Sequence, residues 1–68
     1  MKSVSGKALC RVLEKNGWVR LRVTGSHHAY GRQGNPTRLS VPVHANAALK
    51  RGLLAHFLKV AGLTEADL

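Results

Sequence analysis

Val23-Thr24-Gly25-Ser26-His27-His28-Ala29-Tyr30 is the stretch of this sequence that decides the fold. It places a Gly-Ser pair between two runs of strand-forming residues, which is typical of a two-residue β-hairpin whose first turn residue is glycine, as a type II′ turn requires. Neighbouring side chains in a strand point to opposite faces. The sequence therefore predicts that one histidine is exposed on the sheet, while the other lies nearer the helices or the end of the hairpin.

The segments on either side of this hairpin alternate between apolar and polar residues. Residues 18–24 are expected to form a strand whose inward side chains are Val19, Leu21 and Val23, and whose open face holds Trp18, Arg20, Arg22 and Thr24. A polar loop follows at residues 32–36. Residues 37–43 then predict a third strand, with Leu39, Val41 and Val43 inward and Arg38 and Ser40 outward. Pro42 favours an edge strand or a strand end at that point.

A helix is expected on each side of the three strands. The first begins after an N-cap at Ser5 and reaches about Asn16, and the second begins near Asn46 and ends at Gly62. Both have an apolar stripe that needs a surface to cover. The order predicts an α+β fold in which two helices cover one face of an antiparallel sheet. We expect a single domain over residues 1–68, with a core of about 5–63 and a tail at 64–68.

The chain is strongly basic. Its 68 residues include 11 Lys and Arg but 3 Asp and Glu, which gives a net charge of +8. Such a charge predicts a polyanionic partner, namely RNA, DNA or an acidic protein. No apolar run approaches the roughly 20 residues of a membrane span, and a single cysteine, Cys10, fits a reducing compartment. We therefore expect a cytoplasmic protein with no membrane partner.

The scarcity of carboxylates excludes several kinds of chemistry. Ser-His-Asp relays and paired-carboxylate hydrolysis lack their acids, and the histidine spacing suits no metal site, so no metal or small-molecule cofactor is expected. A lone histidine among cations can still cleave RNA, because the neighbouring 2′-OH attacks the phosphorus and the imidazole transfers a proton. A non-catalytic RNA-binding module and a basic protein-interaction domain for an acidic partner fit the same composition.

Several motifs follow one another in a fixed order after the first helix: Asn16-Gly17-Trp18, Gly25-Ser26-His27-His28, Val41-Pro42-Val43-His44, Leu49-Lys50-Arg51-Gly52-Leu53-Leu54 and Ala61-Gly62-Leu63. Together they resemble the HicA (YcfA-like) mRNA interferase toxins over about residues 5–63. The resemblance implies an α-β-β-β-α fold like that of double-stranded-RNA-binding domains. It also implies ribosome-independent cleavage of mRNA that arrests translation. With the absence of a metal site expected from the residues, the first hypothesis is a metal-independent endoribonuclease. A HicB-type antitoxin encoded beside it would mask the active histidine.

The same resemblance implies which residues form the site. His27, directly after Gly25 and Ser26, matches the catalytic histidine, with His28 as the alternative because some members place it one residue later. The candidate RNA-binding residues are Arg20, Arg22, Arg32, Arg38, Lys50 and Arg51. Lys50 and Arg51 are favoured slightly, because the start of the second helix often touches phosphate in such folds. Trp18 is expected as a lid on the core, with base stacking by Trp18 or Tyr30 as the alternative.

Overall fold

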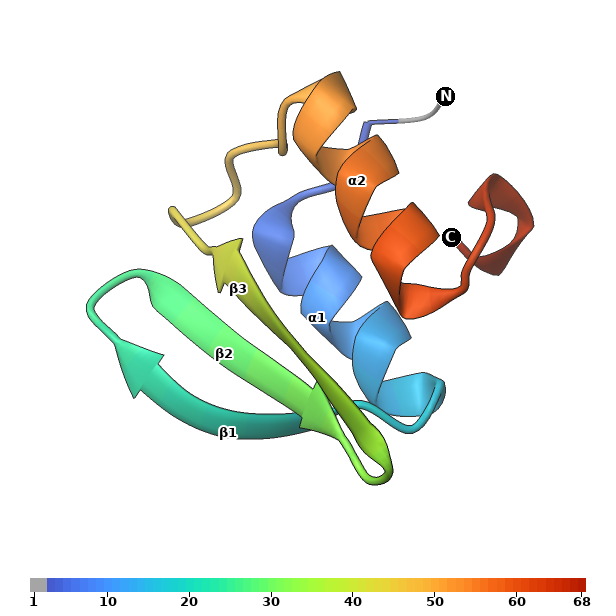
Figure 1. The fold of residues 1–68 in the computed structure, drawn as a ribbon. Helices are drawn as coiled ribbons and strands as arrows, with labels where there is room; N and C mark the ends of the chain where they lie inside the picture. The colour runs from blue at the N-terminus through green and yellow to red at the C-terminus, as the bar shows by residue number, and fades with distance from the viewer. Residues whose placement is uncertain (1–2) are drawn as a thin grey trace.

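Two helices and a three-stranded antiparallel sheet make up the computed structural model, which describes residues 3–68. The elements are α1 (Gly6–Lys15), β1 (Val19–Thr24), β2 (His27–Arg32), β3 (Asn35–Pro42), α2 (Arg51–Ala61) and a short 3₁₀ helix, η1 (Glu65–Asp67). The strand order is β1-β2-β3, and both helices lie on the same side of the sheet (Figure 1). This confirms the predicted α-β-β-β-α order and the α+β class.

Helix α1 begins where its capping residue predicts. The Ser5 hydroxyl accepts a hydrogen bond from the Ala8 amide at 3.1 Å, which satisfies one of the free N–H groups of the first turn. Leu9 and Leu13 are fully buried, so the apolar stripe of α1 faces the sheet. The helix ends at Asn16, as expected.

The core lies between the sheet and the two helices. Its largest fully buried side chains are Trp18, Tyr30, Leu9, Leu13, Leu54 and Val41. Trp18 is 2% exposed and Tyr30 is 1% exposed, so both aromatic rings are part of the core. The expectation of a core lid at Trp18 is confirmed, and base stacking by either ring is wrong.

Strand β1 does not follow the predicted alternation. Its residues are all exposed, including Val19 at 59%, Leu21 at 52% and Val23 at 48%. Arg20 pairs with Tyr30 of β2, but Arg22 pairs with Ala29, so the register shifts between these two arginines. Such a β-bulge sets two residues of one strand opposite one residue of its partner and interrupts the alternation. The predicted inward orientation is therefore wrong for Val19 and Leu21. Val23, which pairs with His28, keeps the predicted face but is exposed there.

Helix α2 begins later than predicted. Residues 44–50 are irregular because they are held to the N-terminal segment: the Leu49 amide donates to the Val4 carbonyl at 2.8 Å, and Ala48 forms an isolated bridge with Ser5. Lys50 is the N-cap, without a capping side chain, so the prediction that Asn46 caps this helix is wrong. The predicted end at Gly62 is confirmed by its left-handed φ of +74°.

Candidate active site on the open sheet face

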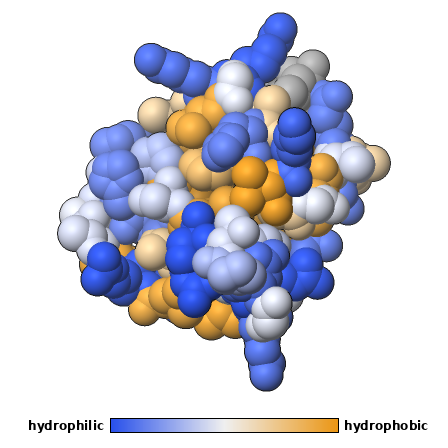
Figure 2. Space-filling model, viewed as in Figure 1, coloured by the Kyte–Doolittle hydropathy of each residue, from blue (hydrophilic) through white to orange (hydrophobic). Residues whose placement is uncertain are grey.

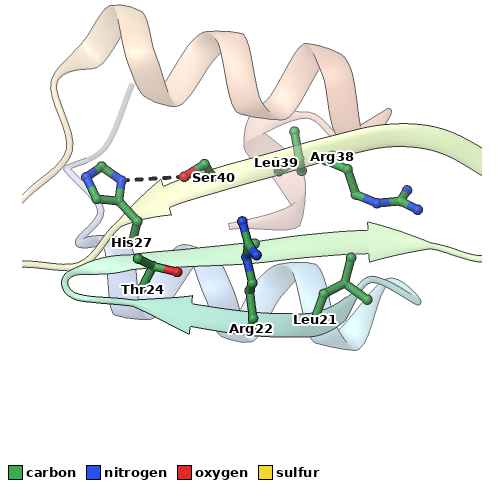
Figure 3. Close-up of a pocket in the computed structure, with 8 residues that line it drawn as sticks. Leu21, Arg22, Thr24, His27, Arg38, Leu39 and Ser40 are labelled. Atoms are coloured by element: carbon green, nitrogen blue, oxygen red, sulfur yellow. Dashed lines mark hydrogen bonds between the residues drawn. The ribbon is translucent and has the colours of Figure 1, made fainter.

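The sheet has one face covered by the helices and one face turned away from them, which we call the open face. A hollow of about 490 Å³ lies on it, and we call it the central hollow. It is lined by Leu21, Arg22, Thr24, His27, Ala29, Arg38, Leu39 and Ser40, from all three strands (Figure 3). Figure 2 shows apolar surface along the lower edge of the molecule, where β1 runs.

His27 stands at one end of the central hollow because of the hairpin turn before it. Gly25 has φ of +59° while the φ of Ser26 is not positive, which matches the predicted type II′ geometry. The Ser26 carbonyl accepts a hydrogen bond from the Val43 amide at 2.6 Å, so the turn is fastened to the end of β3. His27 then begins β2, paired with Thr24 on one side and Pro42 on the other.

The imidazole of His27 is exposed and has one neighbour within hydrogen-bonding range. Its Nδ1 lies 3.4 Å from the Ser40 hydroxyl (Figure 3), and the tautomer decides which of the two donates. Nε2 makes no hydrogen bond to any residue from 3 to 68. Ser40 therefore contacts one ring nitrogen, and the other is free to bind a ligand.

His28 points the other way. It pairs with Val23 of β1 and with Val41 of β3, and the Val41 side chain is fully buried beneath the helices. His28 is accordingly partly buried on the helix-covered face. The prediction that the two histidines occupy opposite faces is confirmed.

Two of the predicted RNA-binding residues share the central hollow with His27. They are Arg22 and Arg38, one from each edge strand. The Arg38 guanidinium is anchored, since its Nη1 donates to the carbonyls of Asn35 at 3.0 Å and Thr37 at 3.2 Å. Arg32 lines a neighbouring hollow, the distal hollow, together with Val19, Leu21, Gly31, Gln33 and Arg38.

The other three candidate cations lie elsewhere. Arg20 pairs with Tyr30, whose ring is in the core, so Arg20 belongs to the helix-covered face. The prediction that Arg20 lies on the open face is wrong. Lys50 lines a separate hollow with Pro42 and His44, beyond the end of β3. Arg51 is the first residue of α2 and is exposed. The structure thus brings Arg22, Arg38 and His27 together, with Arg32 adjoining them.

The open face is electropositive because all three acids lie on other elements. Glu14 is on α1, where it accepts a hydrogen bond from the Tyr30 hydroxyl at 2.6 Å. Glu65 and Asp67 are on η1. An anionic ligand on the open face therefore meets Arg22 and Arg38 with no competing carboxylate from the chain.

Cys10 is buried in the core and is unsuited to act as a nucleophile. Burial, ahead of the nearby charge of Glu14, raises the pKa of its thiol above the usual value of 9.0. The neutral thiol is the form present at physiological pH. This leaves histidine as the side chain able to transfer a proton in the central hollow.

Within residues 3–68, no group of three or more His, Cys, Asp or Glu side chains is placed to hold a metal ion. The same part of the chain includes no helix with the length and apolarity needed to cross a bilayer. A reaction without a resident metal stays a prediction.

Five lining residues of the central hollow were not proposed from the sequence as site residues: Leu21, Thr24, Ala29, Leu39 and Ser40. Ser40 was predicted to point outward by alternation, but the contact with His27 depends on the pairing of β2 with β3. Leu21 was assigned to the core, and nothing local in the sequence indicates the bulge that exposes it.

Comparison with known proteins supplies the family. No curated protein matches the chain. One family model does match, described as HicA toxin of bacterial toxin-antitoxin, and it spans residues 6–63, from the first residue of α1 to just beyond α2. Since this range includes both helices, all three strands and the histidine hairpin, the chain belongs to the HicA toxin family of bacterial toxin–antitoxin systems.

Proposed function

We propose that the protein is an mRNA interferase, an endoribonuclease that cleaves mRNA without a metal and so arrests translation. The observation that carries this proposal is the exposed imidazole of His27 in one hollow with Arg22 and Arg38, in a member of a toxin family. The hollow supplies a proton-transfer group and positive charge, and those are the two things that RNA cleavage requires of a protein.

The reaction uses the RNA's own nucleophile. The ribose 2′-oxygen forms a bond to phosphorus and loses its proton, while the bond from phosphorus to the 5′-oxygen of the next nucleotide breaks and that oxygen gains a proton. The products are a 2′,3′-cyclic phosphate and a free 5′-hydroxyl. Nε2 of His27 would transfer one of these protons, and Arg22 would stabilise the charge that develops on the phosphate, while Arg38 adds positive charge farther along the hollow.

Ser40 would orient the catalytic ring. Its hydroxyl lies near Nδ1 of His27, and a hydrogen bond there selects the tautomer and limits ring rotation. The 3.4 Å separation is long for such a bond, and catalytic hydrogen bonds often shorten when substrate binds. Ser40 is thus a positioning residue, since it acts through His27.

An antitoxin is the expected partner, because the family's description assigns the toxin to bacterial toxin–antitoxin systems. The open face suits an antitoxin of the HicB type with acidic groups, which would cover His27 and neutralise Arg22 and Arg38. Cleavage of mRNA would take place in the cytoplasm, which is the compartment we propose for the protein.

The decisive experiment compares single-histidine variants for cleavage of purified mRNA in the presence of EDTA. His27→Ala should lower the cleavage rate by about 10²- to 10⁴-fold, the usual contribution of general acid–base catalysis. Ser40→Ala should lower it about fivefold, as expected for one lost hydrogen bond of about 1 kcal/mol, with partial rescue by Ser40→Thr.

His28→Ala and His56→Ala are the matched controls. His28 is the adjacent residue on the other face, and His56 is exposed on α2. Both variants should cleave at rates close to that of the wild type. Full activity of His27→Ala would refute the role of His27, and full activity of both His27→Ala and His28→Ala would refute histidine-dependent cleavage. A wild type that binds RNA in a salt-sensitive way without cleaving it would indicate a binding module instead.

A further inference from the structure

Gly31 leaves a gap in the middle strand that side chains from both neighbouring strands fill. A Cβ at this position would lie 2.8 Å from Leu21 Cδ1 and 3.2 Å from Arg38 Nε and Cζ. The φ of Gly31 is not positive, so the backbone conformation itself is open to other residues. The missing side chain leaves room for the leucine of β1 and the guanidinium of β3 to lie over Gly31 of β2.

The guanidinium of Arg38 is fixed in this position. Its two hydrogen bonds from Nη1, to the Asn35 and Thr37 carbonyls, hold the group along β3. A guanidinium fixed beside an apolar side chain presents a flat surface of the kind on which nucleobases stack. Because the side chain is already ordered, stacking on it costs little further conformational entropy.

This surface is open and lies apart from His27. Leu21 is 52% exposed, and Leu21 and Arg38 are the two residues common to the central and distal hollows. Figure 3 shows His27 and Ser40 at one end, Leu21 and Arg38 toward the other, and Arg22 between them. From His27 to Gly31 is four residues of extended strand, or about 13 Å.

We propose that Leu21 and Arg38 form a stacking platform for one unpaired nucleobase, so that the protein binds single-stranded RNA in preference to duplex RNA. The inference rests on the proposed ribonuclease function and adds the substrate class. An RNA strand would place one phosphate near His27 and Arg22 and a base farther along, on the platform. A duplex offers no free base, because its bases are paired and stacked on one another.

Charge distinguishes this occupant from an apolar peptide. Arg22, Arg38 and His27 line the same hollow, and no acid of the chain lies on the open face. The combination of cations with a small apolar surface matches a polyanion that has flat apolar groups, which is the chemistry of single-stranded RNA.

The test begins with wild-type protein and a short RNA whose 2′-oxygens are methylated, which prevents cleavage. Binding is measured by fluorescence anisotropy for the single strand, for the same strand in a duplex, and for strands with one abasic position moved along the sequence. The single strand should bind more tightly than the duplex. One abasic position should weaken binding about tenfold, because a stacked base is lost there.

Variants of Leu21 and Arg38 then test whether the base detected in this way stacks on the platform. Leu21→Ala and Arg38→Lys should each weaken single-strand binding about tenfold and abolish the sensitivity to the abasic position. Arg38→Lys keeps the positive charge, so the dependence of binding on salt should not change. Val23→Ala is the matched control, since Val23 is 48% exposed on the same strand but shares the face of His28; its binding should equal that of the wild type.

Several outcomes would overturn the platform. One is that the wild type binds the duplex as tightly as the single strand. Another is that Leu21→Ala binds the single strand as tightly as Val23→Ala does. In either case the proposed function would stand if the wild type still cleaved RNA. A loss of antitoxin binding alone in Leu21→Ala would assign the surface to that partner. Absence of both RNA binding and cleavage in the wild type would overturn the proposed function as well.

Discussion

Tyr30 links the middle strand to the first helix. It is 1% exposed, and its hydroxyl donates to the Glu14 carboxylate at 2.6 Å. Burial and, second, this hydrogen bond raise the pKa of Tyr30 far above its usual value of 10.0. Because the pKa is higher in the folded state than in the unfolded state, the protonated hydroxyl contributes stability that is fully present below pH 10.0 and is lost as the pH rises above it.

We predict that the melting temperature of the wild type falls steeply above about pH 10 and that Tyr30→Phe has a shallower fall. At pH 7 the variant should be less stable by about 1–3 kcal/mol, because it lacks a hydrogen bond to a charged group. Thermal melts from pH 7 to about 11 measure both effects. Cys10, whose pKa is also raised by burial, adds a loss of the same sign above 9.0, and Cys10→Ala isolates that part. Parallel alkaline curves for wild type and Tyr30→Phe would contradict the prediction.

The sequence predicted those features of the candidate site that depend only on neighbouring residues in the chain. His27 follows a Gly-Ser turn and alternates with His28, so the opposite orientation of the two side chains follows from strand geometry alone. The contact of His27 with Ser40 could not be predicted, because it depends on how β3 pairs with β2.

At the scale of elements, α1 and the end of β3 pack closely. Gly6 is the buried first residue of α1, and a Cβ there would lie well inside the contact distance of the Pro42 carbonyl oxygen. Since that oxygen belongs to the backbone, the helix or the strand would have to move. This packing fixes how α1 sits against the sheet end that includes His27, which pairs with Pro42.

We predict that Gly6→Ala lowers the free energy of unfolding by about 1–3 kcal/mol, as overpacking does in other cores. For a domain of this size each kcal/mol shifts the melting temperature by about 4–8 °C. Gly52→Ala is the control, because it is also near a helix start but nothing lies within 4 Å of its Cβ. That control should keep or slightly raise stability. Equal melting temperatures for Gly6→Ala and wild type would show that the helix has room to shift.

The side-chain orientations of β1 and the start of α2 were mispredicted because both depend on pairing or hydrogen bonds with other segments of the chain. The alternation of residues 18–24 is regular in sequence, but the bulge between Arg20 and Arg22 separates those two arginines onto different faces. Asn46 has the chemistry of a cap, yet tertiary hydrogen bonds to the N-terminal segment keep residues 44–50 extended or turned. The elements themselves and their order were predicted from hydrophobic period and turn residues.

For the whole molecule, the net charge of +8 lowers the stability of the fold but favours the binding of a polyanion. Like charges repel one another in the compact state, and salt screens this repulsion. Salt would also weaken the proposed RNA binding, because releasing counterions into a more concentrated salt solution is less favourable. The excess of cations that would attract an RNA substrate therefore also limits the stability of the fold.

We predict that raising NaCl from about 50 mM to about 300 mM increases the melting temperature while weakening single-stranded RNA binding by about 10- to 100-fold. Melting curves and anisotropy titrations over the same salt series measure the two trends. Arg22→Gln should reduce the slope of binding against salt by about 0.7 for a single strand, without altering the trend in melting temperature. A melting temperature that falls with salt would mean that favourable ion pairs outweigh the repulsion.

The division of the sheet into a covered and an open face has a consequence for how this protein adapts. The residues that hold the fold together, such as Leu9, Leu13 and Val41, are buried behind the sheet, whereas Leu21, Arg22 and Arg38 are exposed in front of it. Substitutions in front of the sheet should therefore cost little folding stability. If the open face binds RNA and the antitoxin as proposed, mutation and selection can change either interaction while the scaffold behind the sheet stays the same.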